Sequence, residues 1–351
     1  MDANTLAEYS VISLYSAMAV LTLSMLGFVL YLARAATARD DARSGAGVRA
    51  VDRELVEARH GAGGGGAEAS MPDATDAVSA VPGVAGERHT GDAARAARKA
   101  AGPARMFAWL ATLLLAAAVI MRGASVHRPP LGNLYEFVTA ASLVVMLAFC
   151  LWGLRRNVDW LGVFVTAPVL LMLGMAVTLW YTEAAQLLPS LRSYWLVIHV
   201  TVATISVGVF TLAAMVTVLY LLADRAEAKA AAGTPGTGMG ARLMRVLPRA
   251  RELERLSYAL HVIAFPLWTF TLIAGAIWAR QAWASYWNWD PKEVWTFIIW
   301  VVYAAYLHAR ATTGISKQRA AYIALAGFGC IIVNYSIVNM YFVGQHSYSG
   351  L

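Results

Sequence analysis

The amino-acid sequence predicts an all-α membrane protein with about eight transmembrane helices. Of its 351 residues, 59% are hydrophobic and only 14% are charged. Apolar runs of about twenty residues recur along the chain, and each is long enough to cross ~30 Å of hydrocarbon as a helix. The basic residues collect in alternate connections between these runs, as they do in proteins that cross a membrane several times.

The apolar runs divide the chain into eight predicted spans. An even number of spans places both termini on one side of the membrane. The first run lacks a basic segment before it and a small-residue cleavage pattern after it, which favours a retained helix over a signal peptide. The predicted spans are Tyr9–Leu32, Arg105–Met121, Asn133–Gly153, Trp160–Tyr181, Trp195–Leu222, Leu256–Ala279, Glu293–Arg310 and Ala321–Val343.

The charge of the connections predicts which side each one faces. Arginine and lysine are frequent after the first, third, fifth and seventh spans and sparse elsewhere. Because basic connections stay in the cytoplasm, we expect both termini and the connection at 283–295 outside the plasma (inner) membrane. The same pattern accounts for the net charge of +7 without a nucleic-acid partner.

We expect three regions along the chain. Residues 1–33 hold the first transmembrane helix, and residues 105–351 form a seven-helix membrane domain. Between them, residues 34–104 contain the run GAGGGGAEAS, scattered prolines, mixed charges and almost no aromatic residues. Such a chain buries too little apolar surface to offset its ordering entropy, so we expect a disordered cytoplasmic linker. The two cysteines, Cys150 and Cys330, form no C-x-x-C pair and are expected to be packing residues.

The segment 283–295, WASYWNWDPKEVW, stands out because it concentrates Trp283, Trp287, Trp289 and Trp295 between two apolar runs. Trp287 and Trp289 face the same way if the segment is extended, whereas Trp283 and Trp287 stack if it is helical. Either conformation makes a shelf for a large, flat ligand. The alternative is an ordinary aromatic belt at the level of the lipid headgroups.

The end of this segment also indicates the start of a helix. Asp290 takes the N-cap position, Pro291 the first helical position and Glu293 the third, which is a capping box. We therefore expect Asp290 to be a structural residue first, so that Asp290→Asn impairs function less than Trp289→Ala does.

Two histidines are expected on the same outer side. His199 lies near the outer end of the fifth span, and His346 directly follows the eighth. Each one alone fits a hydrogen-bonding residue at the interface. Together, beside a flat aromatic surface, they fit the axial ligands of a porphyrin iron, which accepts imidazole nitrogen on both faces. Glu136 and Glu183 are expected in the same outer region, within reach of a charged ligand.

Another histidine is expected deep in the membrane. His308 follows Trp295 by thirteen residues, which is roughly 20 Å of helical rise. Ala304 and Ala305, one turn earlier, would let another group approach that face. The histidine fits either a ligand for a cofactor or substrate, or a buried residue bonded to a neighbouring helix. His261, at a comparable depth, fits a second ligand or a side chain that reaches the inner interface.

Several motifs resemble one family. The segment WASYWNWDPKEVW resembles the WWD signature of the haem-handling proteins of cytochrome c assembly. The stretches WTFIIWVVYAAYLHAR, HRPPLGNLYEF, LVIHV and GQHSYSGL are similar to the CcsA (ResC) branch of system II cytochrome c biogenesis. The resemblance covers Val126–Leu351. It departs at Ala284, where relatives usually have glycine, and we expect little consequence from one methyl group.

The resemblance implies that the chain binds haem b, with external axial ligands and a further ligand inside the membrane. It also implies a membrane partner, CcsB (ResB), and an apocytochrome c that receives haem at its C-x-x-C-H site. A thioredoxin-like thiol reductant is a further candidate partner. The residues expected to bind the cofactor are Trp283, Trp287, Trp289, Asp290 and Trp295 together with the iron ligands His199, His346 and His308.

Three functions from different classes fit the sequence. The chain is a membrane subunit of the system II cytochrome c synthase, or a haem transporter or chaperone that hands haem to a separate ligase, or a scaffold whose aromatic segment docks a protein. The histidine pair argues against the scaffold. In a synthase the reactive groups belong to haem and the apocytochrome, so the chain contributes positioning and no catalytic residue, and its status as an enzyme stays open.

Overall fold

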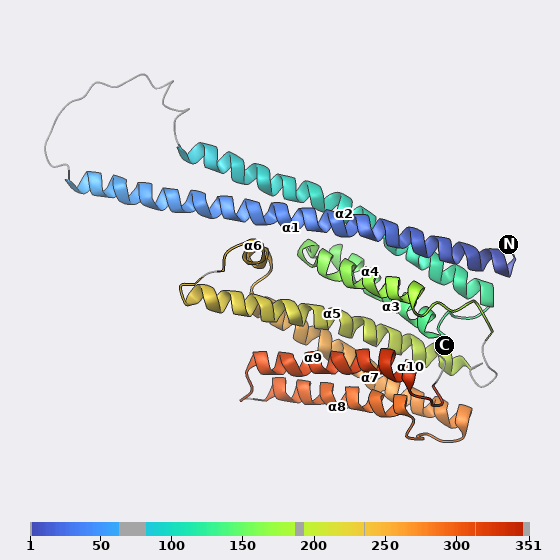
Figure 1. Ribbon diagram of the computed structural model, residues 1–351. Coiled ribbons are helices and arrows are strands. Elements are labelled where there is room, and N and C mark those ends of the chain that lie inside the picture. Colours follow the sequence, from blue (N-terminus) through green and yellow to red (C-terminus); the bar gives the residue numbers. More distant parts are fainter. Residues whose placement is uncertain (1, 63–81, 187–192, 235, 313, 347–351) are drawn as a thin grey trace.

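Eight helices in the described part of the chain are long and apolar enough to cross a membrane, which confirms the predicted all-α polytopic class. The computed structural model describes residues 2–62, 82–186, 193–234, 236–312 and 314–346 (Figure 1). The helices are α1 (Ala3–Ala62), α2 (Pro82–Val126), α3 (Leu134–Gly153), α4 (Gly162–Thr178), α5 (Tyr194–Ala231), α6 (Met239–Val246), α7 (Ala250–Trp283), α8 (Pro291–Ala311), α9 (Lys317–Val333) and α10 (Asn339–Tyr341), with a 3-10 turn at Asp159–Leu161 and a π-helix at Asn334–Val338.

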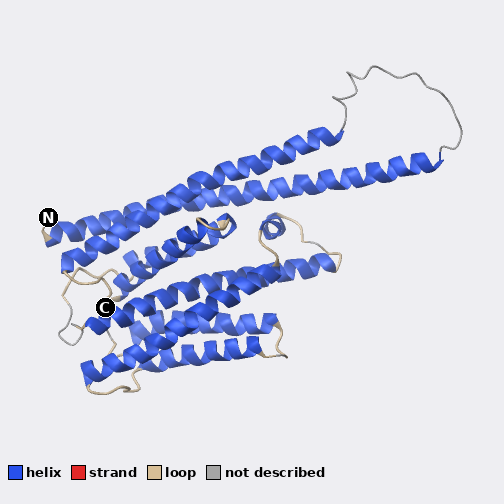
Figure 2. Cartoon of the chain, turned by 180° about the vertical axis from the view of Figure 1, so that it is seen from behind, coloured by secondary structure: helices blue, strands red, loops and turns tan. Residues whose placement is uncertain are grey.

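The helices run roughly antiparallel in layers. α1 and α2 form a long pair along one side, α3 and α4 lie beneath them, and α5, α7, α8 and α9 form the other side (Figures 1 and 2). The beginning of α1, the end of the described chain and the α7–α8 connection all lie at one end of the bundle. This is the arrangement expected from an even number of spans.

The helices α1 and α2 extend far into the predicted linker. α1 continues to Ala62 and α2 begins at Pro82, so both helices occupy parts of the 34–104 region for which the sequence predicted a disordered linker. Residues 63–81 lie outside the described chain. Alanine, arginine and glutamate are frequent in both extensions and favour helix, and a helix that has already nucleated in the membrane needs only to propagate.

A buried carboxylate fixes the start of α3. Glu136 has no exposed surface. Its oxygens accept hydrogen bonds from Arg122 at 3.1 Å, from Arg128 at 2.7 and 3.1 Å and from the backbone N–H of Gly132 at 2.8 Å. The two arginines also donate to carbonyls of the connection at 179–186. Glu136 therefore joins α2 and α3 to two connections, and both of its oxygens accept hydrogen bonds from these groups.

The connection between α7 and α8 begins with a left-handed residue. α7 ends at Trp283, and Ala284 follows with φ 60° and ψ 13°. Glycine adopts this conformation without steric cost, whereas a residue with a Cβ atom loses about 1 kcal/mol. From the sequence we expected little effect, because the methyl group of Ala284 is small. The left-handed backbone conformation adds a conformational cost that does not depend on the volume of the side chain.

We predict that Glu136→Gln lowers the free energy of unfolding by roughly 3 kcal/mol, because the buried Arg122 and the half-buried Arg128 lose their counter-charge. Thermal unfolding in detergent, followed by tryptophan fluorescence, measures the loss. Glu183→Gln is the matched control, since Glu183 is exposed and its variant should unfold like the wild type. Equal unfolding temperatures for the two variants would contradict the prediction.

We predict that Ala284→Gly stabilises the protein by roughly 1 kcal/mol, which raises the unfolding temperature by about 2 °C. The same substitution at Ala282, in the last turn of α7, should instead lower it, because glycine forms helix less readily than alanine. Differential scanning calorimetry of the two variants measures both changes in unfolding temperature. A decrease at both positions would rule out relief of strain at residue 284.

Candidate functional site

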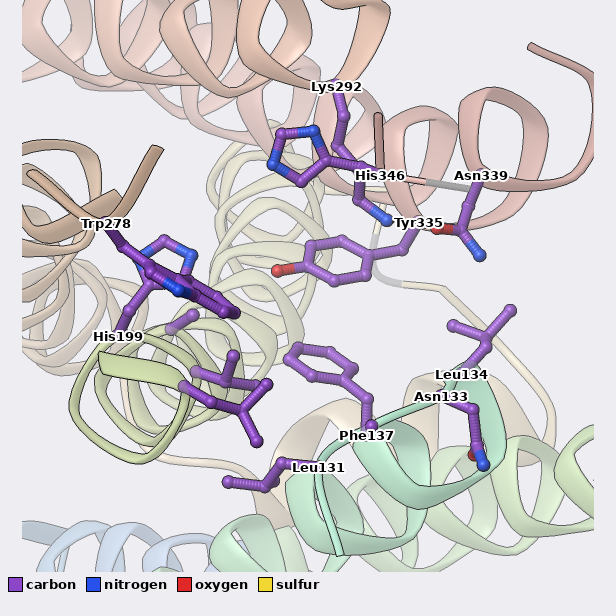
Figure 3. Close-up of a pocket in the computed structure, with 14 residues that line it drawn as sticks. Leu131, Asn133, Leu134, Phe137, His199, Trp278, Lys292, Tyr335, Asn339 and His346 are labelled. Carbon is purple, nitrogen blue, oxygen red and sulfur yellow. Dashed lines mark hydrogen bonds between the residues drawn. The ribbon is translucent and has the colours of Figure 1, made fainter. Parts of the chain in front are cut away.

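A cavity opens at the end of the bundle where the α7–α8 connection lies. It consists of two adjoining hollows, with about 690 and 620 Å³ of empty space including space open to solvent. The side chains that line both hollows are His199, Ala203, Lys292, Tyr335 and His346 (Figure 3). The two histidines expected at an outer site therefore share one cavity.

His199 is oriented by the neighbouring helix. It lies in the second turn of α5, and its Nδ1 is 3.0 Å from the carbonyl oxygen of Thr271 on α7. A carbonyl only accepts, so Nδ1 carries the proton and the lone pair of the neutral ring lies on Nε2. A Cβ atom at Gly275 would lie 2.7 Å from the His199 ring, so the ring occupies this place because residue 275 is glycine.

His346 is oriented by a carboxylate. Its Nδ1 lies 3.0 Å from Oδ1 of Asp290, and its ring packs edge-on against Trp283 at 4.8 Å between centroids. The acceptor again favours a proton on Nδ1 and a lone pair on Nε2. Histidines that ligate a metal usually donate their other nitrogen to a carbonyl or a carboxylate, which is the arrangement of both rings here.

Asp290 is both a helix cap and the partner of His346. The predicted capping box with Glu293 is present at the start of α8. Asp290 also accepts from the backbone N–H of Gln345 at 2.6 Å and of Lys292 at 3.0 Å. Burial raises the pKa of the Asp290 carboxyl, but the hydrogen bonds from His346 and the two backbone groups lower it more, so the pKa falls below 3.8.

The direction of this pKa shift fixes its effect on stability. The pKa of Asp290 is lower in the folded protein than in the unfolded chain, so ionisation of the carboxylate favours folding. The stabilisation is fully present above the ordinary aspartate pKa. It is lost as the pH falls through the lower pKa of the folded state, well below neutrality, so Asp290 stays ionised at neutral pH.

Aromatic rings form much of the cavity wall. Phe137 and Tyr335 stack at 4.6 Å with 15° between their planes, and Trp278 lies 5.8 Å from the His199 ring (Figure 3). Tyr335 belongs to the π-helix that interrupts the last span. Trp287 adds a ring from the α7–α8 connection. These planar faces suit a flat, largely apolar ligand.

The four predicted tryptophans are placed differently from one another. Trp283 contacts His346, and Trp287 lines the second hollow. Trp289 is 77% exposed with φ 58°, and it meets the edge of Trp287 at 5.9 Å. Trp295 is half-buried in α8 and lines neither hollow. The connection is thus neither the extended strand nor the helix considered from the sequence, and only part of it faces the cavity.

The two deeper histidines lie apart from this cavity. His308 is exposed on the outer face of α8, on the same stripe as Phe297 and Val301. His261 is only 1% exposed, and its Nδ1 lies 2.8 Å from the carbonyl oxygen of Ser257, which accepts its proton. Its Nε2 has no hydrogen-bond partner in the described part of the chain.

Sequence reasoning missed several residues of the cavity. Asn334 and Asn339 offered a signal, because amides are costly inside an apolar span. Lys292 offered another, because a cation in the first turn of a helix opposes the helix dipole. Nothing in the pattern singled out the aromatic wall. The missed residues include Phe137, Trp278, Lys292, Asn334, Tyr335 and Asn339.

No group of three or more histidine, cysteine, aspartate or glutamate side chains with metal-binding geometry occurs among the described residues. Two imidazoles across one cavity are the set that an iron already held by a porphyrin would need.

Comparison with known proteins shows the family of the chain. Residues 131–346 match the family described as Cytochrome C assembly protein. A cytochrome c biogenesis protein CcsA of Prochlorococcus marinus (strain MIT 9313) is 36% identical over 259 residues, which cover 68% of this chain and 81% of that protein. The CcsA of Guillardia theta is 36% identical over 242 residues, covering 63% and 77%, and that of Synechococcus elongatus is 34% identical over 286 residues, covering 68% and 85%. The chain belongs to the CcsA family of cytochrome c biogenesis proteins and takes part in cytochrome c maturation.

Proposed function

We propose that this chain is the membrane subunit of a system II cytochrome c synthase, which binds haem b as its substrate with His199 and His346 as axial ligands. One observation carries the proposal: the two histidines come from distant parts of the chain, line the same cavity, and each has its Nδ1 directed at an acceptor. Rings held in this way present Nε2 to a ligand without first losing rotamer freedom.

The cavity also suits the rest of the substrate. The stacked pair Phe137 and Tyr335 and the indole of Trp278 offer planar apolar surface to a macrocycle. A porphyrin binds by burying its faces against such rings while the iron takes nitrogen from both sides. The exposed Trp289 lies at the rim, where an approaching apocytochrome peptide would meet it.

In this mechanism the chain positions its substrate. His199 and His346 hold the iron, and the aromatic wall holds the ring so that its vinyl groups face the incoming cysteine thiols. Each thiol adds its sulfur and its hydrogen across one vinyl double bond and forms a thioether. Exchange of one chain histidine for the histidine of the C-x-x-C-H motif then releases the product. The excess of basic residues in alternate connections supports an outer location for these steps, at the plasma membrane.

His308 fits a role shared with a partner. Its exposed position on α8 faces away from the bundle, and the neighbouring Ala304 and Ala305 leave room beside it. A second membrane protein of the CcsB type could supply the opposite ligand, so that haem is held between the two chains on its way outward. His261 does not suit this role, since it is buried inside the bundle.

We predict that His199→Gly and His346→Gly each weaken haem binding and abolish the bis-histidine absorption spectrum. Added imidazole should restore the spectrum, because it fills the space of the missing ring. His127→Gly is the control, since His127 is exposed with φ 53°, which glycine tolerates. The spectra are measured on each variant purified with its partner. If both variants give the wild-type spectrum, His199 and His346 are not the iron ligands. Normal haem binding without thioether formation on an apocytochrome peptide would favour the transporter or chaperone.

We predict that Asp290→Asn lowers haem affinity about 10- to 100-fold, the usual effect of losing a residue that orients a metal-ligating histidine. Asparagine still caps a helix, so α8 should be retained. Trp289→Ala should change affinity much less, because its ring is 77% exposed. This order reverses the one expected from the sequence. Haem titrations of both variants decide it, and a larger loss of affinity in Trp289→Ala would show that Asp290 serves mainly as a cap.

A further inference from the structure

We propose that Lys292 makes the cavity selective for a porphyrin with an ionised carboxylate side chain, by pairing its ammonium with one propionate of the substrate. This inference rests on the proposed function of the same cavity. It adds a group that binds the periphery of the porphyrin, whereas the two histidines bind its central iron.

Lys292 is the charged residue best placed for this role. Among the described residues that line the first hollow, it is the only side chain with a fixed charge. It also lines the second hollow, where Glu293 is the other charged residue. Because Lys292 shares both hollows with His199 and His346, a ligand that spans the two imidazoles comes within reach of its ammonium (Figure 3).

The nearby carboxylates accept from backbone groups and from His346. Oxygens of Asp290 accept from two backbone N–H groups and face His346. Glu293 accepts from the backbone N–H of Asn288 at 2.8 Å and of Asp290 at 3.2 Å. In the described chain no carboxylate oxygen forms an ion pair with Lys292, in contrast to Lys317, whose Nζ lies 3.4 Å from Glu254.

The groups that do contact the ammonium are neutral. Nζ of Lys292 donates to Oδ1 of Asn339 and lies 5.1 Å from the centroid of the Tyr335 ring. An ammonium can donate three hydrogen bonds, so Asn339 leaves capacity for an anion. Asp290 acts on this half-buried cation through its charge without forming an ion pair, and a carboxylate that enters the cavity and accepts from the ammonium stabilises the cation further.

The position of Lys292 in its helix supports a role in binding. It is the second residue of α8, where the helix dipole is positive and a cation is disfavoured by up to about 1 kcal/mol. Residues that oppose a local rule without an evident structural gain are expected at functional sites. The competing explanation is that Lys292 only ties α8 to the last span through Asn339.

The two explanations differ in how they respond to the ligand. Haem and haem dimethyl ester share the iron and the macrocycle, but the ester has no ionised propionate. We expect the wild-type chain, purified with its partner, to bind haem about 10- to 100-fold more tightly than the ester, as a charge-assisted hydrogen bond predicts. Lys292→Met should bind both ligands with affinities within about twofold, and Lys292→Arg should keep the preference.

The preference is a ratio measured within one variant, so a general loss of folding cannot imitate its disappearance. Lys317→Met is the matched control. Lys317 is exposed at the start of α9, away from the cavity, so its substitution should leave the ratio of the two affinities unchanged. If Lys292→Met keeps the wild-type ratio, or if the wild type shows no preference, the inference is overturned while haem binding by the histidines stands. If the wild type binds neither ligand with a bis-histidine spectrum, both proposals fall.

Discussion

The site depends on how the Asp290 carboxylate distributes its two oxygens. One accepts from the backbone at the start of α8 and faces His346, and the other accepts from the backbone of Gln345. One ionised group thus joins the first turn of one span to the segment that follows the last. The cap that starts the helix and the partner that orients His346 are the same side chain, so local folding and the geometry of the site cannot vary independently.

Each histidine is also placed by the absence of a side chain. Gly275 leaves room for the His199 ring, and a Cβ atom at Gly344 would overlap a carboxylate oxygen of Asp290. Close approach of this kind lets hydrogen bonds form between elements that are far apart in sequence. Groups of the chain itself thus orient both rings, which would reduce the entropy lost in the proposed binding of haem.

Much of this could be predicted from the sequence, for identifiable reasons. The eight spans follow from hydropathy, and the capping box of Asp290 and Glu293 follows from their spacing, since both are local properties. The contact between His346 and Asp290 could not be predicted, because it joins residues 56 positions apart. The helical extensions of α1 and α2 were missed because the composition was judged by burial, whereas a helix needs only favourable propensity to continue.

The π-helix at Asn334–Val338 determines which face of the last span points into the cavity. A π turn accommodates one more residue than an α turn, so the chain beyond it is rotated by about 100° relative to an uninterrupted α-helix. Loss of a single residue there would leave the last span just as apolar and just as able to cross the membrane. It would nevertheless turn Asn339 and the chain leading to His346 onto another face. The register of this span therefore cannot be read from its hydropathy. It matters only for the side chains that the span places in the cavity.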